Sequence, residues 1–184
     1  EDGDLFASTN TKPIVKKNLQ LLTARMVEYD RKTIDGLIAR GFKFDNGEDG
    51  AGHQWKVRTR YGGYYLDAGC SQLIIDGEIG LLQIEKFVAD GALLKDGSVK
   101  AVDLIILATG FVSQEVVVAK LLGEEVAKKV GPVWGFGPDG EMSNMWRRTP
   151  QEGLWFVGGS FANCRTYSRY VANQIKAIEE GLLS

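Results

Sequence analysis

The stretch Gly153-Leu-Trp-Phe-Val-Gly-Gly-Ser-Phe-Ala-Asn-Cys-Arg-Thr-Tyr-Ser168 decides how this chain is interpreted, together with the segment that follows it. Residues 154–157 form an apolar run of the length of a buried strand, and Gly158-Gly159 interrupts it. An amphipathic helix is predicted next, with Gly181 as its stop. Its apolar face carries Tyr167, Val171, Ile175 and Ile178.

A strand, a glycine turn and a helix together present backbone N–H groups and the positive end of a helix dipole to an anionic ligand. Glycine suits such a turn because a side chain would hold the ligand away from the backbone. Arg165 and Ser168 add a charged donor and a hydroxyl close to the helix start. The pattern is equally compatible with a tight strand-to-helix connection that binds nothing, and the local sequence leaves both interpretations open.

Composition excludes several classes of function. The chain has 184 residues, 44% of them hydrophobic, which suits one ordinary globular domain with a real core. Its net charge of −2 gives no electrostatic reason to expect nucleic acid. Cys70 and Cys164 lack metal-ligand spacing, and His53 is the single histidine, so a zinc or iron site is not expected.

The same features predict a cytoplasmic protein. The two cysteines suit free thiols in a reducing compartment, and the acidic start does not resemble a signal peptide. The apolar runs are too short to cross a bilayer, so no membrane association is expected.

The first third of the chain gives weak signals. Residues 1–29 are interpreted as a solvated surface segment. The segment contains a basic cluster of Lys12, Lys16 and Lys17, for which a solvent-exposed surface is the favoured interpretation and an anion-binding site the alternative. A short helix is predicted between Asp30 and Gly41.

Short strands and an aromatic patch are expected between that helix and the middle of the chain. A short strand is considered at 42–44, a loop at 45–52 and β structure at 55–60. Residues 62–71 combine glycines with Tyr64 and Tyr65, and they suit either a pocket wall or, slightly better, an aromatic-packed strand.

Residues 79–108 predict a β-meander followed by a buried strand. Residues 79–88 are strand-like, and Asp90-Gly91 and Asp96-Gly97 are hairpin turn signals because both residue types tolerate positive φ. Residues 102–108 are apolar on both faces apart from Asp103, as in a strand covered by helices on both sides.

A helix and a long connection are predicted next. The helix starts after Ser113 and stops at Gly131-Pro132. The Gly- and Pro-rich residues 131–153 form a connection. Within it, 135–140 matches G-x-G-x-x-G, but no strand precedes it and no helix follows, so it is not a dinucleotide fingerprint.

Three ordered motifs resemble the C-terminal part of flavin-containing monooxygenases. They are Asp103-Leu-Ile-Ile-Leu-Ala-Thr-Gly-Phe111, Gly153-Leu-Trp-Phe-Val-Gly-Gly159, and Arg165-Thr-Tyr-Ser168 with Gln174-Ile-Lys-Ala177. Residues 62–70 and 73–77 also resemble a bacterial and fungal branch of that group, and the similarity covers most of residues 30–184.

The resemblance implies an α/β fold, namely a partial two-dinucleotide-binding-domain flavoprotein fold with a β-meander, C-terminal half only. Residues 1–112 would be the C-terminal remnant of the NAD(P)H-binding domain. Residues 113–150 would form a helix and a Gly-rich connection, and 151–184 the last strand and helix of the FAD-binding domain. Both dinucleotide fingerprints, and with them the N-terminal half, are missing from this sequence.

Carried over by position, the resemblance also implies cofactor-binding and substrate residues. Those near FAD and NADPH would be Thr109, Gly110, Phe111, Gly158, Gly159, Ser160, Arg165 and Ser168. An aromatic substrate pocket would use Tyr64, Tyr65, Trp155 and Tyr167.

The implied chemistry is a flavin oxygenation. NADPH reduces FAD, O₂ reacts with the reduced flavin, and one oxygen atom passes to a small organic substrate: a soft nitrogen or sulfur nucleophile, or a ketone. The expected partners are that substrate and either the missing N-terminal half or a homodimer partner. Two alternatives remain open: a cofactor-free descendant, such as a cyclase, isomerase or binding module that uses the aromatic pocket, and a non-catalytic fragment.

Overall fold

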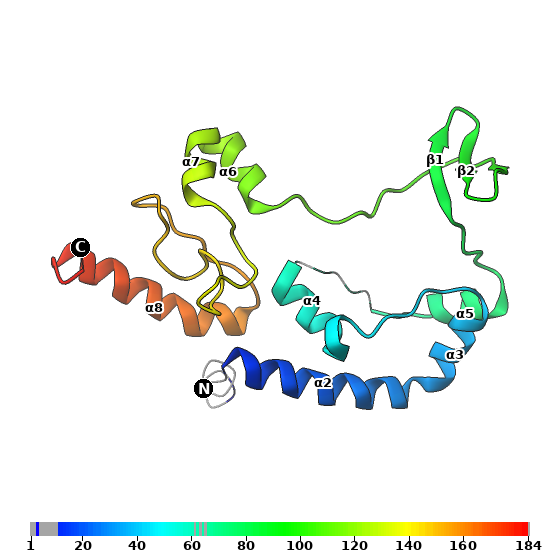
Figure 1. Ribbon diagram of the computed structural model, residues 1–184, viewed down its shortest axis with the longest axis horizontal. Coiled ribbons are helices and arrows are strands. Elements are labelled where there is room, and N and C mark those ends of the chain that lie inside the picture. Colours follow the sequence, from blue (N-terminus) through cyan, green and yellow to red (C-terminus); the bar gives the residue numbers. More distant parts are fainter. Residues whose placement is uncertain (1–2, 4–10, 61, 63, 65, 184) are drawn as a thin grey trace. The chain divides into compact units, whose positions relative to one another are not determined.

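The computed structural model describes residues 3, 11–60, 62, 64 and 66–183 (Figure 1). This part of the chain is a mixed α and β structure with one small antiparallel sheet. It divides into two compact units built from discontinuous segments. The first unit comprises residues 1–23, 46–63 and 111–184, and the second comprises 24–45 and 64–110.

The second unit contains a helix pair and the sheet. Helix α3 (Arg31–Ala39) starts after Asp30 and is followed by Gly41 at φ +89°, as predicted. It packs on α5 (Cys70–Asp76), and a Cβ at Gly36 would lie 3.0 Å from Cδ1 of Ile75. A side chain at position 36 would therefore require Ile75 to shift by a few tenths of an ångström, and glycine allows the close α3–α5 contact without that shift.

The predicted β-meander is confirmed. Strands β1 (Ile84–Val88), β2 (Gly91–Leu94) and β3 (Val99–Lys100) pair antiparallel in that order. The turns between them contain the two Asp-Gly signals, and Gly91 and Gly97 have φ values of +140° and +85°. Asp96 stabilises its turn by accepting hydrogen bonds from the backbone N–H and hydroxyl of Ser98.

Residues 102–108 are not the buried strand that their composition predicts. They continue from β3 as an irregular segment, without a ladder partner among the described residues. Leu104 and Ile106 are 77% and 80% exposed. A two-sided apolar strand needs neighbouring strands and covering helices, and the described part of the second unit supplies neither for this segment.

Three other strand predictions also fail. Residues 42–44 have no regular structure, and 66–69 are irregular until α5 begins at Cys70. Positions 61, 63 and 65 lie outside the described residues. Residues 55–60 belong to α4 (Gly52–Arg60), a helix that buries mainly Trp55.

The N-terminal helix was not predicted. Residues 1–29 were interpreted as a solvated surface segment, but Lys12–Tyr29 form helix α2, in which Leu19 is buried. In the first unit, Leu19 packs with Ala51 and Trp55, and Phe136 covers that cluster. A short 3₁₀ helix, η1 (Glu48–Gly50), precedes α4 and lies in the loop predicted at 45–52.

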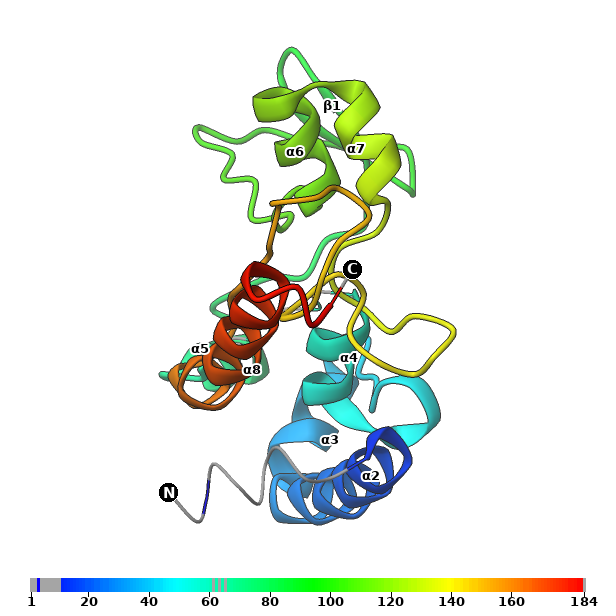
Figure 2. The same ribbon diagram turned by 90° about the vertical axis from the view of Figure 1, so that its left-hand side faces the viewer.

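The helix predicted after Ser113 is interrupted. It consists of α6 (Gln114–Leu122) and α7 (Glu124–Val130), which lie side by side (Figures 1 and 2). Gly123 separates them with φ +94°, a conformation that ends one helix and lets the next turn back. Gly131, with φ +72°, ends the pair at the predicted place.

The long connection contains the second apolar cluster of the first unit. Val130, Val133 and Met145 are buried there, and half-buried side chains that include Leu154 and Phe156 pack around them. The strand predicted at 154–157 amounts to one parallel bridge between Phe156 and Met145. Helix α8 (Phe161–Glu179) follows and buries Val171.

Candidate functional site

The candidate site is the turn that leads into α8. Gly159 has φ +104°, a region that side-chain-bearing residues avoid, so the turn depends on glycine there. Ser160 occupies the N-cap position in an extended conformation, and its Oγ accepts a hydrogen bond of 3.3 Å from the backbone N–H of Asn163. Ser160 Oγ in turn donates to Asn163 Oδ1 at 2.5 Å. The glycine turn predicted from sequence therefore leads into a 19-residue helix, and Ser160 supplies a cap that the sequence analysis did not predict.

The start of α8 has a donor set that fits a phosphate group. No described residue accepts a hydrogen bond from the backbone N–H groups of Phe161 and Ala162. Arg165 and Ser168 lie one and two turns further along α8, and both are exposed. The two N–H groups at the positive end of the helix are chemically suited to a phosphate, and Arg165 adds a guanidinium one turn away, whereas Ser168 lies about 12 Å along the axis from the cap.

Aromatic packing holds α8 against the connection that precedes it. The rings of Tyr167 and Trp146 lie 5.9 Å apart, and Tyr170 lies 6.1 Å from Tyr167. Gln174 Nε2 donates to the backbone oxygen of Trp146 at 3.1 Å. The backbone N–H of Trp146 donates to the backbone oxygen of Phe156 at 2.9 Å. These contacts join the helix to the segment on which the glycine turn is built.

Burial raises the pKa of the Tyr167 phenol, and the carboxylate of Glu141 adds to the shift. The positive charge of Arg58 acts in the opposite direction. Burial also lowers the pKa of Arg58. The Tyr167 phenol is therefore harder to deprotonate than that of a solvent-exposed tyrosine.

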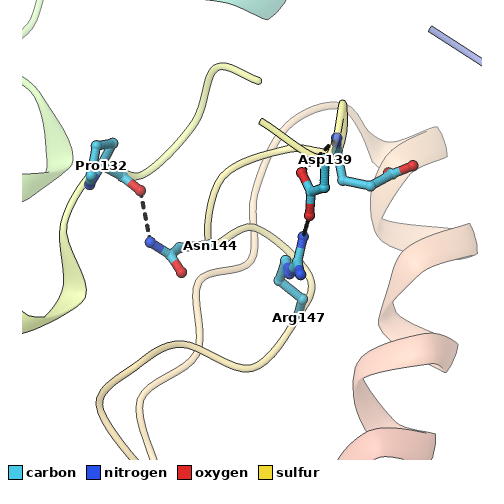
Figure 3. A network of polar contacts seen from close by, with 5 residues as sticks. Pro132, Asp139, Asn144 and Arg147 are labelled. Atoms are coloured by element: carbon cyan, nitrogen blue, oxygen red, sulfur yellow. Dashed lines mark hydrogen bonds and ion pairs between the residues drawn. The ribbon is translucent and has the colours of Figure 1, made fainter. Parts of the chain in front are cut away.

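Polar contacts stabilise the connection before the turn (Figure 3). Asn144 Nδ2 donates to the backbone oxygens of Val130 and Pro132, each at 2.8 Å. Arg147 forms an ion pair of 2.6 Å with Asp139 and, by this hydrogen bond, lowers the pKa of that carboxyl. These contacts hold an irregular segment in one conformation although it contains little regular secondary structure.

The structure brings together only part of the predicted site. Gly158, Gly159, Ser160, Arg165 and Ser168 share the turn and the first two turns of α8. Thr109 and Gly110 are irregular, exposed residues of the second unit, and Phe111 is the exposed residue at which the first unit resumes.

The predicted aromatic pocket stays a prediction. Trp155 and Tyr167 are half-buried in the first unit, and no ring contact between them is present. Tyr64 belongs to the second unit and is 67% exposed. Tyr65 lies outside the described residues.

Two hollows occur elsewhere in the first unit. One, of about 440 Å³, lies between α6 and α7 and includes Glu115. The carboxylate of Glu115 accepts from the backbone N–H of Val133 at 3.2 Å, and its other oxygen is buried without a hydrogen bond. The other, of about 610 Å³, lies where α2, α4 and Phe136 meet.

The sequence analysis did not predict the second hollow, where two lysines of α2 lie over the aromatic rings of Trp55 and Phe136. Lys12 Nζ lies 4.1 Å from the centre of the Phe136 ring, and Lys16 Nζ lies 5.3 Å from that of Trp55. The two rings stack at 5.3 Å. The i, i+4 spacing of the two lysines was the available signal, and it has meaning only if residues 12–29 are helical.

Among the described residues, no group of histidine, cysteine and acidic side chains is arranged to hold a metal ion. None of the helices in the described ranges is long and apolar enough to cross a membrane. No protein-family model matches this chain, and no curated protein matches it.

Proposed function

We propose that this chain is the C-terminal part of an FAD- and NADPH-dependent monooxygenase, which transfers one oxygen atom from O₂ to a small organic substrate. The glycine turn and the start of α8 would contact the FAD diphosphate. Thr109, Gly110 and Phe111 would lie near the nicotinamide nucleotide. We place the protein in the cytoplasm.

The observation that carries this proposal is the glycine turn before a capped helix. Gly159 has a positive φ, and Ser160 caps the helix without using the backbone N–H groups of the first two helical residues. The atoms nearest to a Cβ built at Gly159 belong to Asn163, the first of them at 3.6 Å, so no atom lies in close contact with that position. This geometry allows a phosphate to approach the backbone.

In this proposal the flavin supplies the redox chemistry, and the residues of this chain bind and orient it. Arg165 would compensate phosphate charge, and the α8 dipole would add a favourable field at the same point. Tyr167 would support the helix by packing on Trp146.

The chain alone has too few contacts for tight binding. A helix-terminus contact contributes about 0.3–1 kcal/mol when exposed and up to about 2 when partly buried. A charged hydrogen bond from Arg165 adds roughly 1.5–3 kcal/mol. The sum of about 2–5 kcal/mol, before ordering costs, compares with about 8 kcal/mol for micromolar affinity. We therefore expect the isolated chain to bind FAD with a Kd above roughly 100 μM and to oxidise no NADPH.

The test supplies the missing contacts. The chain is mixed with the N-terminal segment of a flavin-containing monooxygenase that carries both dinucleotide fingerprints and ends before its own Ala-Thr-Gly strand. The visible absorption spectrum and NADPH consumption are recorded for the purified complex. We expect a flavin spectrum and NADPH oxidation from the complex, and neither from the two parts alone.

The comparison of Arg165→Ala with Arg169→Ala locates the site. Arg169 lies on the same helix, one turn further from its start. Arg165→Ala should weaken flavin retention in the complex by roughly 10- to 100-fold, because a charged hydrogen bond is lost, while Arg169→Ala should leave it nearly unchanged. A colourless complex would overturn the proposal, as would equal effects of the two variants. Saturation of the isolated chain by FAD at low micromolar concentration would show that the assigned residues are not the whole site.

A further inference from the structure

The hollow where α2, α4 and Phe136 meet has charged side chains that the proposed function does not use. Its volume is about 610 Å³, and the residues that line it all belong to the first unit. Lys12 and Lys16 line it from α2, Thr59 from α4 and Glu48 from η1. Two of the three lysines for which the sequence left an anion site open therefore line a hollow of ligand size.

Aromatic packing fixes the positions of the two ammonium groups. Lys12 Nζ lies 4.1 Å from the centre of the Phe136 ring, and Lys16 Nζ lies 5.3 Å from the centre of the Trp55 ring. Both lysines are half-buried. An ammonium has three N–H donors, so contact with one ring face leaves donors available. Each ammonium is therefore held in place at the hollow and can still donate hydrogen bonds.

The charges that line the hollow are only partly paired. Lys16 Nζ forms an ion pair of 2.5 Å with Asp49 Oδ2. Within the described ranges, the ammonium of Lys12 and the carboxylate of Glu48 form no ion pair or hydrogen bond, either with each other or with another residue. One positive and one negative side chain thus line the same hollow, and neither neutralises the other.

This arrangement favours a ligand that carries both charges. A simple anion would be attracted by Lys12 but repelled by Glu48, and a simple amine would meet the reverse situation. We propose that the hollow binds a small zwitterion with one carboxylate and one ammonium group, as in an amino acid, with its carboxylate on Lys12 and its ammonium on Glu48. This inference goes beyond the proposed flavin chemistry and does not depend on it.

Probes that carry one or both charges test this assignment. Two zwitterions of different length, γ-aminobutyrate and ε-aminocaproate, are titrated into the whole chain at low ionic strength, where surface charges are least screened. Each is compared with the fatty acid anion and the alkylamine of the same length, and amide NMR spectra report binding. We expect the better zwitterion to shift the amides of Lys12, Lys16 and Glu48 with a Kd of roughly 1–10 mM. This Kd should be about 3- to 10-fold below those of its two singly charged analogues.

Substitutions then assign each end of the ligand. Lys12→Gln should raise the Kd of the zwitterion to about that of the amine, and Glu48→Gln should raise it to about that of the fatty acid anion. Lys17→Gln, at an exposed lysine of the same helix, is the matched control and should leave the Kd unchanged. Lys12→Arg keeps the positive charge and the contact with an aromatic face, so it should retain most of the affinity.

Three outcomes would overturn the proposal. They are the absence of amide shifts up to about 50 mM of either zwitterion, zwitterion binding no tighter than that of the singly charged analogues, and equal effects of Lys12→Gln and Lys17→Gln. The assay contains no flavin and no second polypeptide, so its failure leaves the proposed function untouched. A colourless complex in the flavin experiment likewise leaves this inference intact.

Discussion

The β-meander offers a sharp test of the local structure, because two of its glycines have positive φ but different surroundings. A Cβ at Gly91 would lie 2.1 Å from the carbonyl oxygen of Lys100 and 2.9 Å from its carbonyl carbon. A Cβ at Gly97 would meet nothing within 4 Å. Gly91→Ala therefore forces the backbones of β2 and β3 apart, while Gly97→Ala changes only the backbone preference of a turn.

The difference in cost can be worked out from these contacts. Both substitutions place alanine at positive φ, which costs about 1–2 kcal/mol. Gly91→Ala also disrupts the pairing of Ala92 with Lys100 and of Leu93 with Val99. At roughly 0.5–1.5 kcal/mol for each of one or two hydrogen bonds, the additional loss is about 0.5–3 kcal/mol.

Amide hydrogen exchange measures this loss locally. We expect the exchange rates of amides in the β2–β3 pair to rise about 2- to 150-fold more in Gly91→Ala than in Gly97→Ala. Amides of helices α3 and α5 serve as an internal reference, because Gly91 also pairs with Val88 of β1. Equal effects of the two substitutions would refute the reasoning, because they would show that the close approach of Gly91 to Lys100 does not constrain the sheet.

Three further predictions concern the first unit. Trp55→Ala should lower the free energy of unfolding measured in urea by about 3–5 kcal/mol, because a buried tryptophan stacked on Phe136 is lost; a loss below about 1 kcal/mol would contradict this packing. The pKa of Tyr167 is raised in the folded state, so its contribution to stability is complete below the unfolded value of about 10 and is lost as pH rises through the folded value. A difference titration at 295 nm against Tyr167→Phe should show one phenol ionising later than the others. The pKa of Asp139 is lowered by Arg147, so its stabilising effect is present above about pH 4 and is lost as pH falls through the folded value; Asp139→Asn should reduce that acid dependence, and an unchanged pH profile would count against the ion pair.

The features that sequence predicted correctly depend on local chemistry. Asp90-Gly91 and Asp96-Gly97 specify turns because glycine permits positive φ, and both form turns of the meander. The start of α8 needs only Ser160 and the preceding glycine. In each case the residues that determine the geometry are neighbours along the chain, so the pattern is visible without knowledge of the fold.

The failures arise where a distant contact decides the structure. Residues 55–60 form part of a helix with little amphipathic character, and Trp55 is buried by residues from α2 and by Phe136. The sequence of helix α2 has no clear apolar stripe, and the helix buries only Leu19. Its helical period was therefore not visible in the sequence. The hollow where α2, α4 and Phe136 meet depends on these two helices. It was not predicted because the helices themselves were not predicted.

The proposed site and the uncovered strand share one physical limitation. Composition predicts that residues 102–108 are covered on both faces, because an apolar residue exposed to water has no stabilising role there. It does not specify which polypeptide provides the cover, since strand pairing is a contact between distant segments. The start of α8 has the same limitation, because it depends on contacts from another polypeptide. Its donors suit a phosphate but are too few to hold one at micromolar affinity. A single addition, the flavoprotein N-terminal segment, should therefore change both properties together: if it covers the strand, amide hydrogen exchange in residues 102–108 should slow and flavin retention should rise in parallel as that segment is titrated in. Independent titration curves would show that the strand and the glycine turn serve different partners.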